Sequence, residues 1–187
     1  MAFLLRWGNN LSEELVSSER VYEGRIVNLR VDRVRLPSGR VTSREIVEHR
    51  GAVAIVALDG EENVLLVNQF RTAVGEELLE LPAGTLEPDE EPRVCALREL
   101  REETGYVAEH LEELYVFYAS PGFSNERIWL YMATGLEQHS QDTEGDEIIE
   151  VVKLPLHRAL EMAHTGEICD GKSVLGLMAA KAWMVNS

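Results

Sequence analysis

A near-continuous apolar run from residue 52 to residue 58 constrains the fold of this 187-residue chain more than any other stretch. It reads Ala-Val-Ala-Ile-Val-Ala-Leu and lacks the polar–apolar alternation of a half-exposed strand. Such a run is typical of a strand that is covered on both faces. Residues 59–63 form a turn pattern, and the apolar segment 64–70 after it predicts a second strand that pairs back.

The rest of the chain mixes strand and helix patterns. The segment at about 15–48 alternates in the manner of strands, and within it residues 25–36 and 41–47 predict a hairpin around the turn at 37–39. This segment is too small to bury a core of its own. A helix is expected from Pro92 to Thr104, ending at Gly105. One further strand is expected to end at residue 84, and three others at 114–118, 127–133 and 148–154. Helices are expected at 156–164 and 172–185. This order predicts an α+β fold or a mixed α/β sandwich.

Composition narrows the function classes. A formal net charge of −15 argues against a nucleic-acid partner, because phosphate contacts need clustered Lys and Arg. The chain has no apolar run of the roughly 18 residues that a membrane span needs, and its first residues lack the order of a secretory signal. We therefore expect a soluble, cytoplasmic protein without membrane or nucleic-acid partners. If it handles anionic phosphates, it needs well-placed arginines or metal ions.

The helix at 92–104 carries a carboxylate cluster. Glu99, Glu102 and Glu103 fall within one arc of the helix, which suits a hard divalent cation. The alternative is a solvated helix face held by salt bridges, and the helix alone favours that alternative. The context changes the balance, because a strand ending in Pro-Ala-Gly at Gly84 precedes the helix and Gly105 follows it.

At these positions the chain resembles the Nudix box. The matching residues are Gly84, Glu90, Arg98, Glu99, Leu100, Glu102, Glu103 and Gly105, while Tyr106 replaces the usual aliphatic residue. The resemblance implies an α/β/α sandwich over residues 48–187, preceded by a small N-terminal antiparallel β segment over residues 1–47. It also implies divalent metal and hydrolysis of the diphosphate bond in a nucleoside diphosphate derivative.

The resemblance also implies residue roles. Glu99 and Glu103 would be the main ligands of Mg²⁺, or alternatively Mn²⁺, with help from Glu102 and from the backbone carbonyl of Ala83. Arg98 would orient the carboxylates through charge-assisted hydrogen bonds. Glu90 would either support this site or simply place a favourable charge at the helix N-terminus.

A second stretch resembles the ADP-ribose pyrophosphatases of the Nudix family. Pro121 follows Gly105 at the spacing of that subfamily, and residues 69–71 and 78–84 also look like it. The resemblance implies a domain-swapped homodimer, built through the N-terminal segment, that hydrolyses ADP-ribose to AMP and ribose 5-phosphate. Another nucleoside diphosphate sugar is the alternative substrate.

The same resemblance places residues around the substrate. Arg71 would contact the diphosphate, and Glu80 and Glu126 would contact ribose hydroxyls or metal-bound water. Pro121 belongs to the substrate loop, and Tyr22 is a candidate for adenine stacking.

A proton acceptor is expected on the acidic loop at 142–147. Glu144 is the preferred general base, with Asp146 and Glu147 as alternatives, and the competing interpretation is a solvated acidic turn.

Two other classes compete with a hydrolase. A Nudix-fold sensor would be expected to lose carboxylates from the box, and this chain keeps all of them. A Nudix-fold isomerase would need a cysteine with a partner acid, and Cys95 has no evident partner in the sequence.

Overall fold

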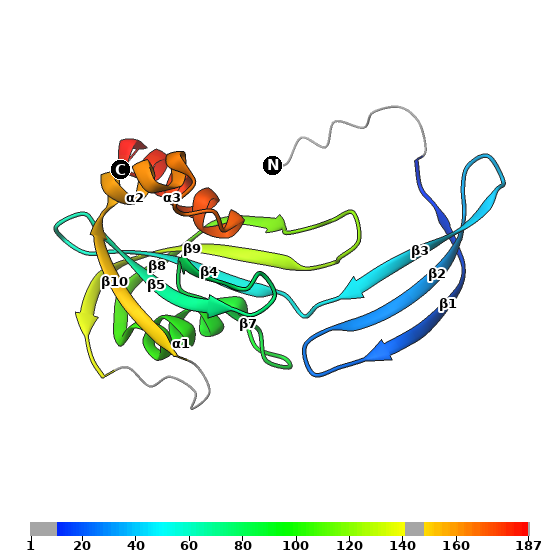
Figure 1. Ribbon diagram of the computed structural model, residues 1–187, viewed down its shortest axis with the longest axis horizontal. Helices are drawn as coiled ribbons and strands as arrows, with labels where there is room; N and C mark the ends of the chain where they lie inside the picture. The colour runs from blue at the N-terminus through cyan, green and yellow to red at the C-terminus, as the bar shows by residue number, and fades with distance from the viewer. Residues whose placement is uncertain (1–10, 141–147, 187) are drawn as a thin grey trace. The chain divides into compact units, whose positions relative to one another are not determined.

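The computed structural model describes residues 11–140 and 148–186, which form two compact units (Figure 1). The first unit contains the chain up to His49 together with the segment Ser120–Asn125. The second unit runs over Arg50–Ala119 and continues from Glu126. The segment around Pro121 therefore groups with the N-terminal residues.

The described N-terminal unit is a three-stranded antiparallel sheet in the order β1-β2-β3, made of β1 (Glu14–Glu23), β2 (Asn28–Arg35) and β3 (Val41–Glu48). The predicted small antiparallel segment is confirmed, and β2 and β3 form the expected hairpin. The strand β1 was not predicted as a separate element. All ten of its residues are exposed, including the apolar side chains of Leu15, Val16, Val21 and Tyr22.

Seven strands form the main sheet within the described residues, in the order β10-β5-β4-β9-β8 with β6 on β5 and β7 on β4. They are β4 (Ala52–Leu58), β5 (Asn63–Arg71), β6 (Glu76–Glu80), β7 (Ala83–Thr85), β8 (Tyr106–Tyr118), β9 (Arg127–Gln138) and β10 (Ile149–Pro155). Among these seven described strands, only β4 and β9 pair in parallel, so the sheet is mixed.

Helices pack on both faces of this sheet, as the apolar run predicts. On one face, alternate residues of β4, such as Ile55, pack against α1 (Pro92–Thr104). On the other face, residues such as Val56 pack against α2 (Leu156–Thr165) and α3 (Gly171–Asn186). The expected sandwich is confirmed. No helix in the described residues is long and apolar enough to cross a membrane.

The strand β8 starts eight residues earlier than the predicted 114–118. Glu109, His110, Glu112 and Glu113 interrupt its apolar pattern, and all four are exposed. The strand forms because its backbone pairs with β9 from Tyr106 onward, and charged side chains are tolerated on a strand at the edge of a sheet.

Candidate active site

The site is built on the chain segment that leaves β6 and enters α1. Leu81 and Pro82 are buried, and the carbonyl of Pro82 accepts a hydrogen bond of 2.9 Å from the backbone N–H of Ile55 in β4. The short strand β7 then pairs with β4. The backbone around Gly84 is thus fixed against the central strand before the chain turns into the carboxylate helix.

Gly84 touches the carboxylate of Glu99. A Cβ placed on Gly84 would lie 1.9 Å from the carboxyl carbon of Glu99 and 1.9 Å from Oε1. Non-bonded contacts of a Cβ atom this short do not occur, so only glycine lets Glu99 occupy this position. The glycine that the sequence pattern singles out therefore has a direct physical role in placing one predicted metal ligand.

Glu103 is hydrogen-bonded to the same short strand, β7. Its Oε2 accepts a hydrogen bond of 2.9 Å from the backbone N–H of Ala83, and the residue is 5% exposed. Leu100 and Ala96 anchor the helix on the sheet beneath it. The helix ends where Gly105 adopts the left-handed conformation with φ 72°, as predicted.

Arg98 lies at the centre of three carboxylates. Its Nε and Nη2 each donate a 2.9 Å hydrogen bond to Glu90. Its Nη1 donates to Glu99 at 2.8 Å and to Glu102 at 2.9 Å. These bonds raise the pKa of Arg98, with the pair to Glu90 contributing most. Glu90 is therefore bound to Arg98, and α1 has no acidic residue in its first turn.

The donor chemistry of this cluster fits a hard divalent cation. Glu99, Glu102 and Glu103, with the carbonyl of Ala83, supply the oxygen ligands that Mg²⁺ prefers. As they lie, no three His, Cys, Asp or Glu side chains within residues 11–140 and 148–186 already form a metal-binding group. Arg98 holds two of the carboxylates, so a side-chain movement has to bring the oxygens together around a cation.

A second charged cluster lies at the end of β6. Both oxygens of Glu80 accept bonds of 2.8 Å from Nε and Nη2 of Arg71, and Glu80 is 1% exposed. The ammonium of Lys172 also donates to Glu80. Burial alone would raise the pKa of Glu80, but Arg71 and Lys172 together lower it. The carboxylate is thus ionised and committed to two cations.

Lys172 is a residue that the sequence analysis missed. It lies in the first turn of α3, where a cation opposes the helix dipole. This unfavourable position of a cation is the sequence signal that Lys172 pairs with carboxylates elsewhere in the fold. Asp170, just before the helix, accepts bonds from the Lys172 ammonium and from both the backbone N–H and the hydroxyl of Ser173.

The remaining predicted residues lie elsewhere. Tyr22 is exposed on β1, and Pro121 is exposed in the segment that groups with the N-terminal sheet. Glu126 is half-buried in the main unit. The predicted general base Glu144 and its alternatives, Asp146 and Glu147, lie outside the described residues.

Cys95 bears on the isomerase alternative. Its side chain is fully buried in the core beneath α1, and burial raises the pKa of its thiol. A protonated, buried thiol suits a packing role. It accepts a long bond of 3.4 Å from Nη2 of Arg98.

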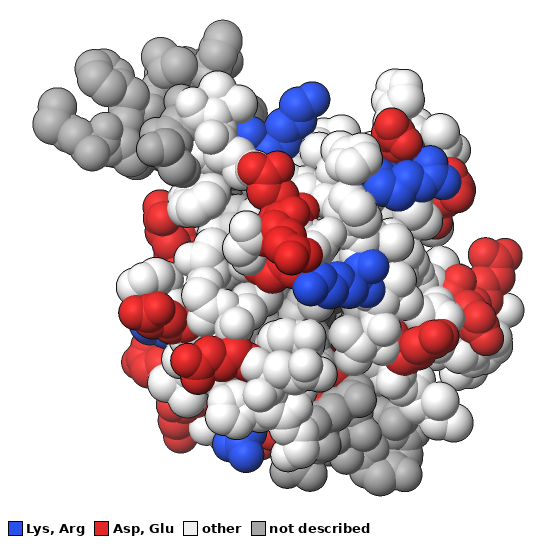
Figure 2. Space-filling view, turned by 90° about the vertical axis from the view of Figure 1, so that its left-hand side faces the viewer, with Lys and Arg blue, Asp and Glu red and all other residues white. Residues whose placement is uncertain are grey.

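The surface charge agrees with the acidic composition. Figure 2 shows acidic side chains in several groups over one face, with fewer basic ones between them. Binding of an anionic substrate therefore depends on local cations, and Arg71 is one candidate. The pKa of Arg71 is raised mainly by its hydrogen bond to Glu80, and the negative charge of Glu103 adds to this effect.

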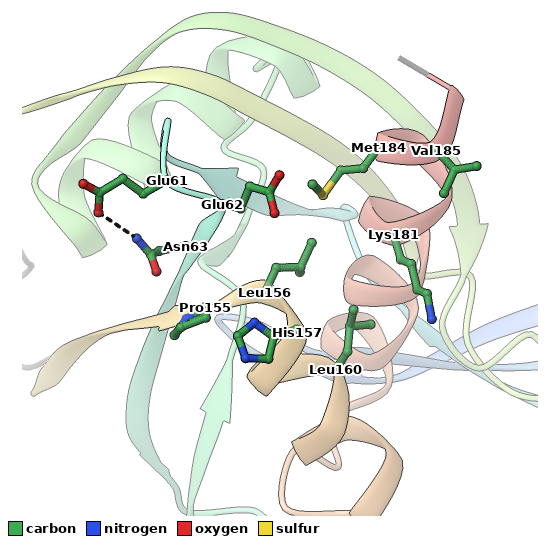
Figure 3. A pocket seen from close by; sticks show the side chains of 10 residues that line it. All are labelled: Glu61, Glu62, Asn63, Pro155, Leu156, His157, Leu160, Lys181, Met184 and Val185. Carbon is green, nitrogen blue, oxygen red and sulfur yellow. Dashed lines mark hydrogen bonds between the residues drawn. The ribbon is translucent and has the colours of Figure 1, made fainter.

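A pocket of roughly 530 Å³ lies away from these clusters (Figure 3). It is bounded by the β4–β5 turn, the start of α2 and the end of α3. Apolar side chains such as Leu156, Leu160 and Met184 line it, together with Lys181. None of the predicted site residues lines it.

The Glu90–Arg98 pair predicts an acid-sensitive stability. The bond to Arg98 lowers the pKa of Glu90 from 4.5 to about 2. Its contribution, about 3 kcal/mol at neutral pH, is therefore present above pH 4.5 and lost as the pH falls towards 2. Urea unfolding of wild type and Glu90→Gln should show a stability difference that shrinks over this window. The exposed neighbour Glu91→Gln is the control, and a pH-independent Glu90→Gln difference would contradict the prediction.

Comparison with known protein families gives two adjoining matches. Residues 48–174 match the model of the NUDIX domain. Residues 13–47 match the model of the nucleoside diphosphate sugar hydrolase N-terminal domain. The two matches meet between residues 47 and 48.

Several named proteins are similar over most of the chain. A methanol dehydrogenase activator of Bacillus methanolicus is 42% identical, over 91% of this chain and 93% of its own length. An ADP-ribose pyrophosphatase of Bacillus subtilis is 38% identical, over 90% and 92% respectively. A GDP-mannose pyrophosphatase of Salmonella arizonae is 42% identical, over 71% and 74%.

Among solved structures, an ADP compounds hydrolase has a similar fold. The TM-score is 0.83 at 20% sequence identity, and the match covers 93% of this chain and 95% of that one. At this identity the likeness concerns the fold alone.

Proposed function

This chain belongs to the Nudix family, and from that premise we propose that it hydrolyses the diphosphate bond of ADP-ribose to AMP and ribose 5-phosphate. The observation that carries the proposal is the close approach of Gly84 in β7 to the carboxylate of Glu99 in α1. The similarity to an ADP-ribose pyrophosphatase over most of both chains supports the substrate.

The residues of this chain would act as follows. Glu99, Glu102 and Glu103, with the carbonyl of Ala83, would hold divalent metal, which we propose is Mg²⁺. When bound, the metal neutralises charge on the diphosphate and lowers the pKa of an attacking water. Arg98 would keep the carboxylates oriented, as its bonds to Glu99 and Glu102 support.

Arg71 would bind the diphosphate. Its Nε and Nη2 are held by Glu80, and within the described part of the chain its Nη1 has no hydrogen-bond acceptor. A guanidinium that is fixed through Nε and Nη2 can still donate a hydrogen bond from Nη1 to a phosphate oxygen. Our proposals for Glu126, Pro121 and Tyr22 at the substrate, and for Glu144 as proton acceptor, rest on the family resemblance.

We also propose that the protein works as a domain-swapped homodimer in the cytoplasm. The strand β1 exposes apolar side chains such as Leu15, Val21 and Tyr22, which a second copy could cover. Light scattering after gel filtration tests this: a dimer is expected, and a monomer at micromolar concentration would overturn it.

Phosphate release tests the activity. Purified protein with Mg²⁺ and ADP-ribose should release phosphate only when alkaline phosphatase is present, since the products are phosphomonoesters and the substrate is not. Chromatography should show AMP. If ADP-ribose is not hydrolysed with any of the divalent metal ions tested, the proposed reaction is wrong.

A substrate panel separates the alternatives. The similarity to a GDP-mannose pyrophosphatase makes another nucleoside diphosphate sugar the second substrate class. The expected result is the highest kcat/KM for ADP-ribose. A thermal shift with Mg²⁺ and ADP-ribose, but without any turnover, would instead identify a non-catalytic sensor.

Activation of a dehydrogenase is a second candidate function, because one relative is named a methanol dehydrogenase activator. Adding the protein to a methanol dehydrogenase tests it, with Glu103→Gln as the comparison. Activation by wild type alone would link the effect to the carboxylate site, while equal activation by both would separate the two functions.

A further inference from the structure

The first turn of α3 is joined to the site through consecutive residues at the end of β6. Lys172 binds the side chain of Glu80, and the hydroxyl of Ser173 accepts a 2.8 Å bond from the backbone N–H of Leu81. Ser173 is fully buried, and its hydroxyl donates a hydrogen bond of 2.5 Å to the carboxylate of Asp170. Two residues further along, the backbone N–H of Ala83 reaches Glu103.

Glu80 is the link between Lys172 and Arg71. Its Oε2 accepts from both Nη2 of Arg71 and the Lys172 ammonium, and its side chain is 2% exposed. A buried carboxylate that lost one of these partners could rotate or draw in water. The Arg71 guanidinium, whose side chain is 41% exposed, would then lose the fixed fork that orients it.

The net charge of this cluster would also weaken diphosphate binding if Lys172 were lost. Arg71 and Lys172 are balanced by Glu80 and Asp170, so this cluster as it stands is neutral. Without the Lys172 ammonium, the same cluster would carry a net negative charge beside a proposed diphosphate site. In a chain with net charge −15, no surplus of positive charge is available to offset that change.

We propose that Lys172 is a positioning residue for substrate binding: it holds Glu80, and through Glu80 it orients Arg71 towards the diphosphate. The expected effect of Lys172 on KM rests on the proposed function. Lys172 itself is mostly buried, with a side chain 13% exposed, and it acts through the carboxylate between them.

Steady-state kinetics with ADP-ribose and Mg²⁺ test the proposal. Lys172→Met should raise KM about tenfold and leave kcat within about twofold, since it weakens binding that substrate and transition state share. Lys172→Arg should recover part of the loss. Lys181→Met, an exposed lysine of the same helix, is the matched control and should leave KM unchanged.

A stability effect has to be separated from a positioning effect. The double variant Glu80→Gln with Lys172→Met removes both charges, so the melting temperature should rise relative to Lys172→Met alone. Its KM should nevertheless stay high, because the ionised partner of Arg71 is gone. A KM that returned to the wild-type value together with the melting temperature would overturn the proposal.

Proton exchange at Nε of Arg71, followed by NMR, gives a readout that needs no activity. Lys172→Met should speed this exchange several-fold relative to wild type, and Lys181→Met should not. An unchanged exchange rate in Lys172→Met would overturn the proposal even if ADP-ribose is hydrolysed. If wild type hydrolyses no nucleoside diphosphate sugar, the proposed function fails while the exchange rate still decides the role of Lys172.

Discussion

Replacing Glu103 by Gln is expected to lower kcat for ADP-ribose by about 10²–10³-fold, because it removes a charge that stabilises the transition state through bound metal. The fold should survive. The amide oxygen of Gln can still accept the hydrogen bond from the backbone N–H of Ala83, which Glu103 accepts at 2.9 Å. The expected variant is therefore folded, with a near-normal melting temperature, and almost inactive.

Glu91→Gln is the control for that variant. Glu91 is exposed at the start of the same helix and is outside the cluster around Arg98, so its loss should leave kcat unchanged within about twofold. A Glu103→Gln enzyme with wild-type kcat would show that the metal centre has been misplaced. Equal losses in both variants would indicate a general effect of charge on the helix.

Gly84→Ala should be the second large effect. Its Cβ would have to occupy space 1.9 Å from the Glu99 carboxyl carbon, so the carboxylate must move. Because the atoms displaced belong to the end of a flexible side chain, the cost in stability should be about 1–2 kcal/mol. The cost in kcat should be about 100-fold or more, since a misplacement near 1 Å is enough to lose that much.

Gly60→Ala provides a matched control. Gly60 lies in the β4–β5 turn of the same unit, and a Cβ there would meet nothing within 4 Å. Circular dichroism and kinetics of the two variants should show one inactive and one active folded protein. If Gly84→Ala retained wild-type kcat, the tight contact with Glu99 would have no role in catalysis.

The sequence predicted the carboxylate helix and the central strand well because both carry local signals. The apolar run at 52–58 has no polar residue, and β4 is indeed covered on both faces. Pro92 and Gly105 mark the ends of α1 through their own backbone preferences, and the helix ends as predicted.

Contacts between distant segments could not be predicted from the sequence. Lys172 and Glu80 lie 92 positions apart, and no local pattern pairs them. The first half of β8 was missed for a similar reason, since its pairing with β9 outweighs its charged sequence. The hydrogen bond between Glu90 and Arg98 could not be predicted either. A carboxylate near a helix start can equally be explained by its favourable interaction with the helix dipole.

Binding of Mn²⁺ to the purified protein, followed by electron paramagnetic resonance, tests the central claim most directly. Wild type and Glu91→Gln are expected to bind the ion with the same affinity, and Glu103→Gln is expected to bind it at least about tenfold more weakly, since it lacks a ligand charge. Equal Mn²⁺ affinity in wild type and Glu103→Gln would contradict the assignment of the α1 carboxylates as the metal centre.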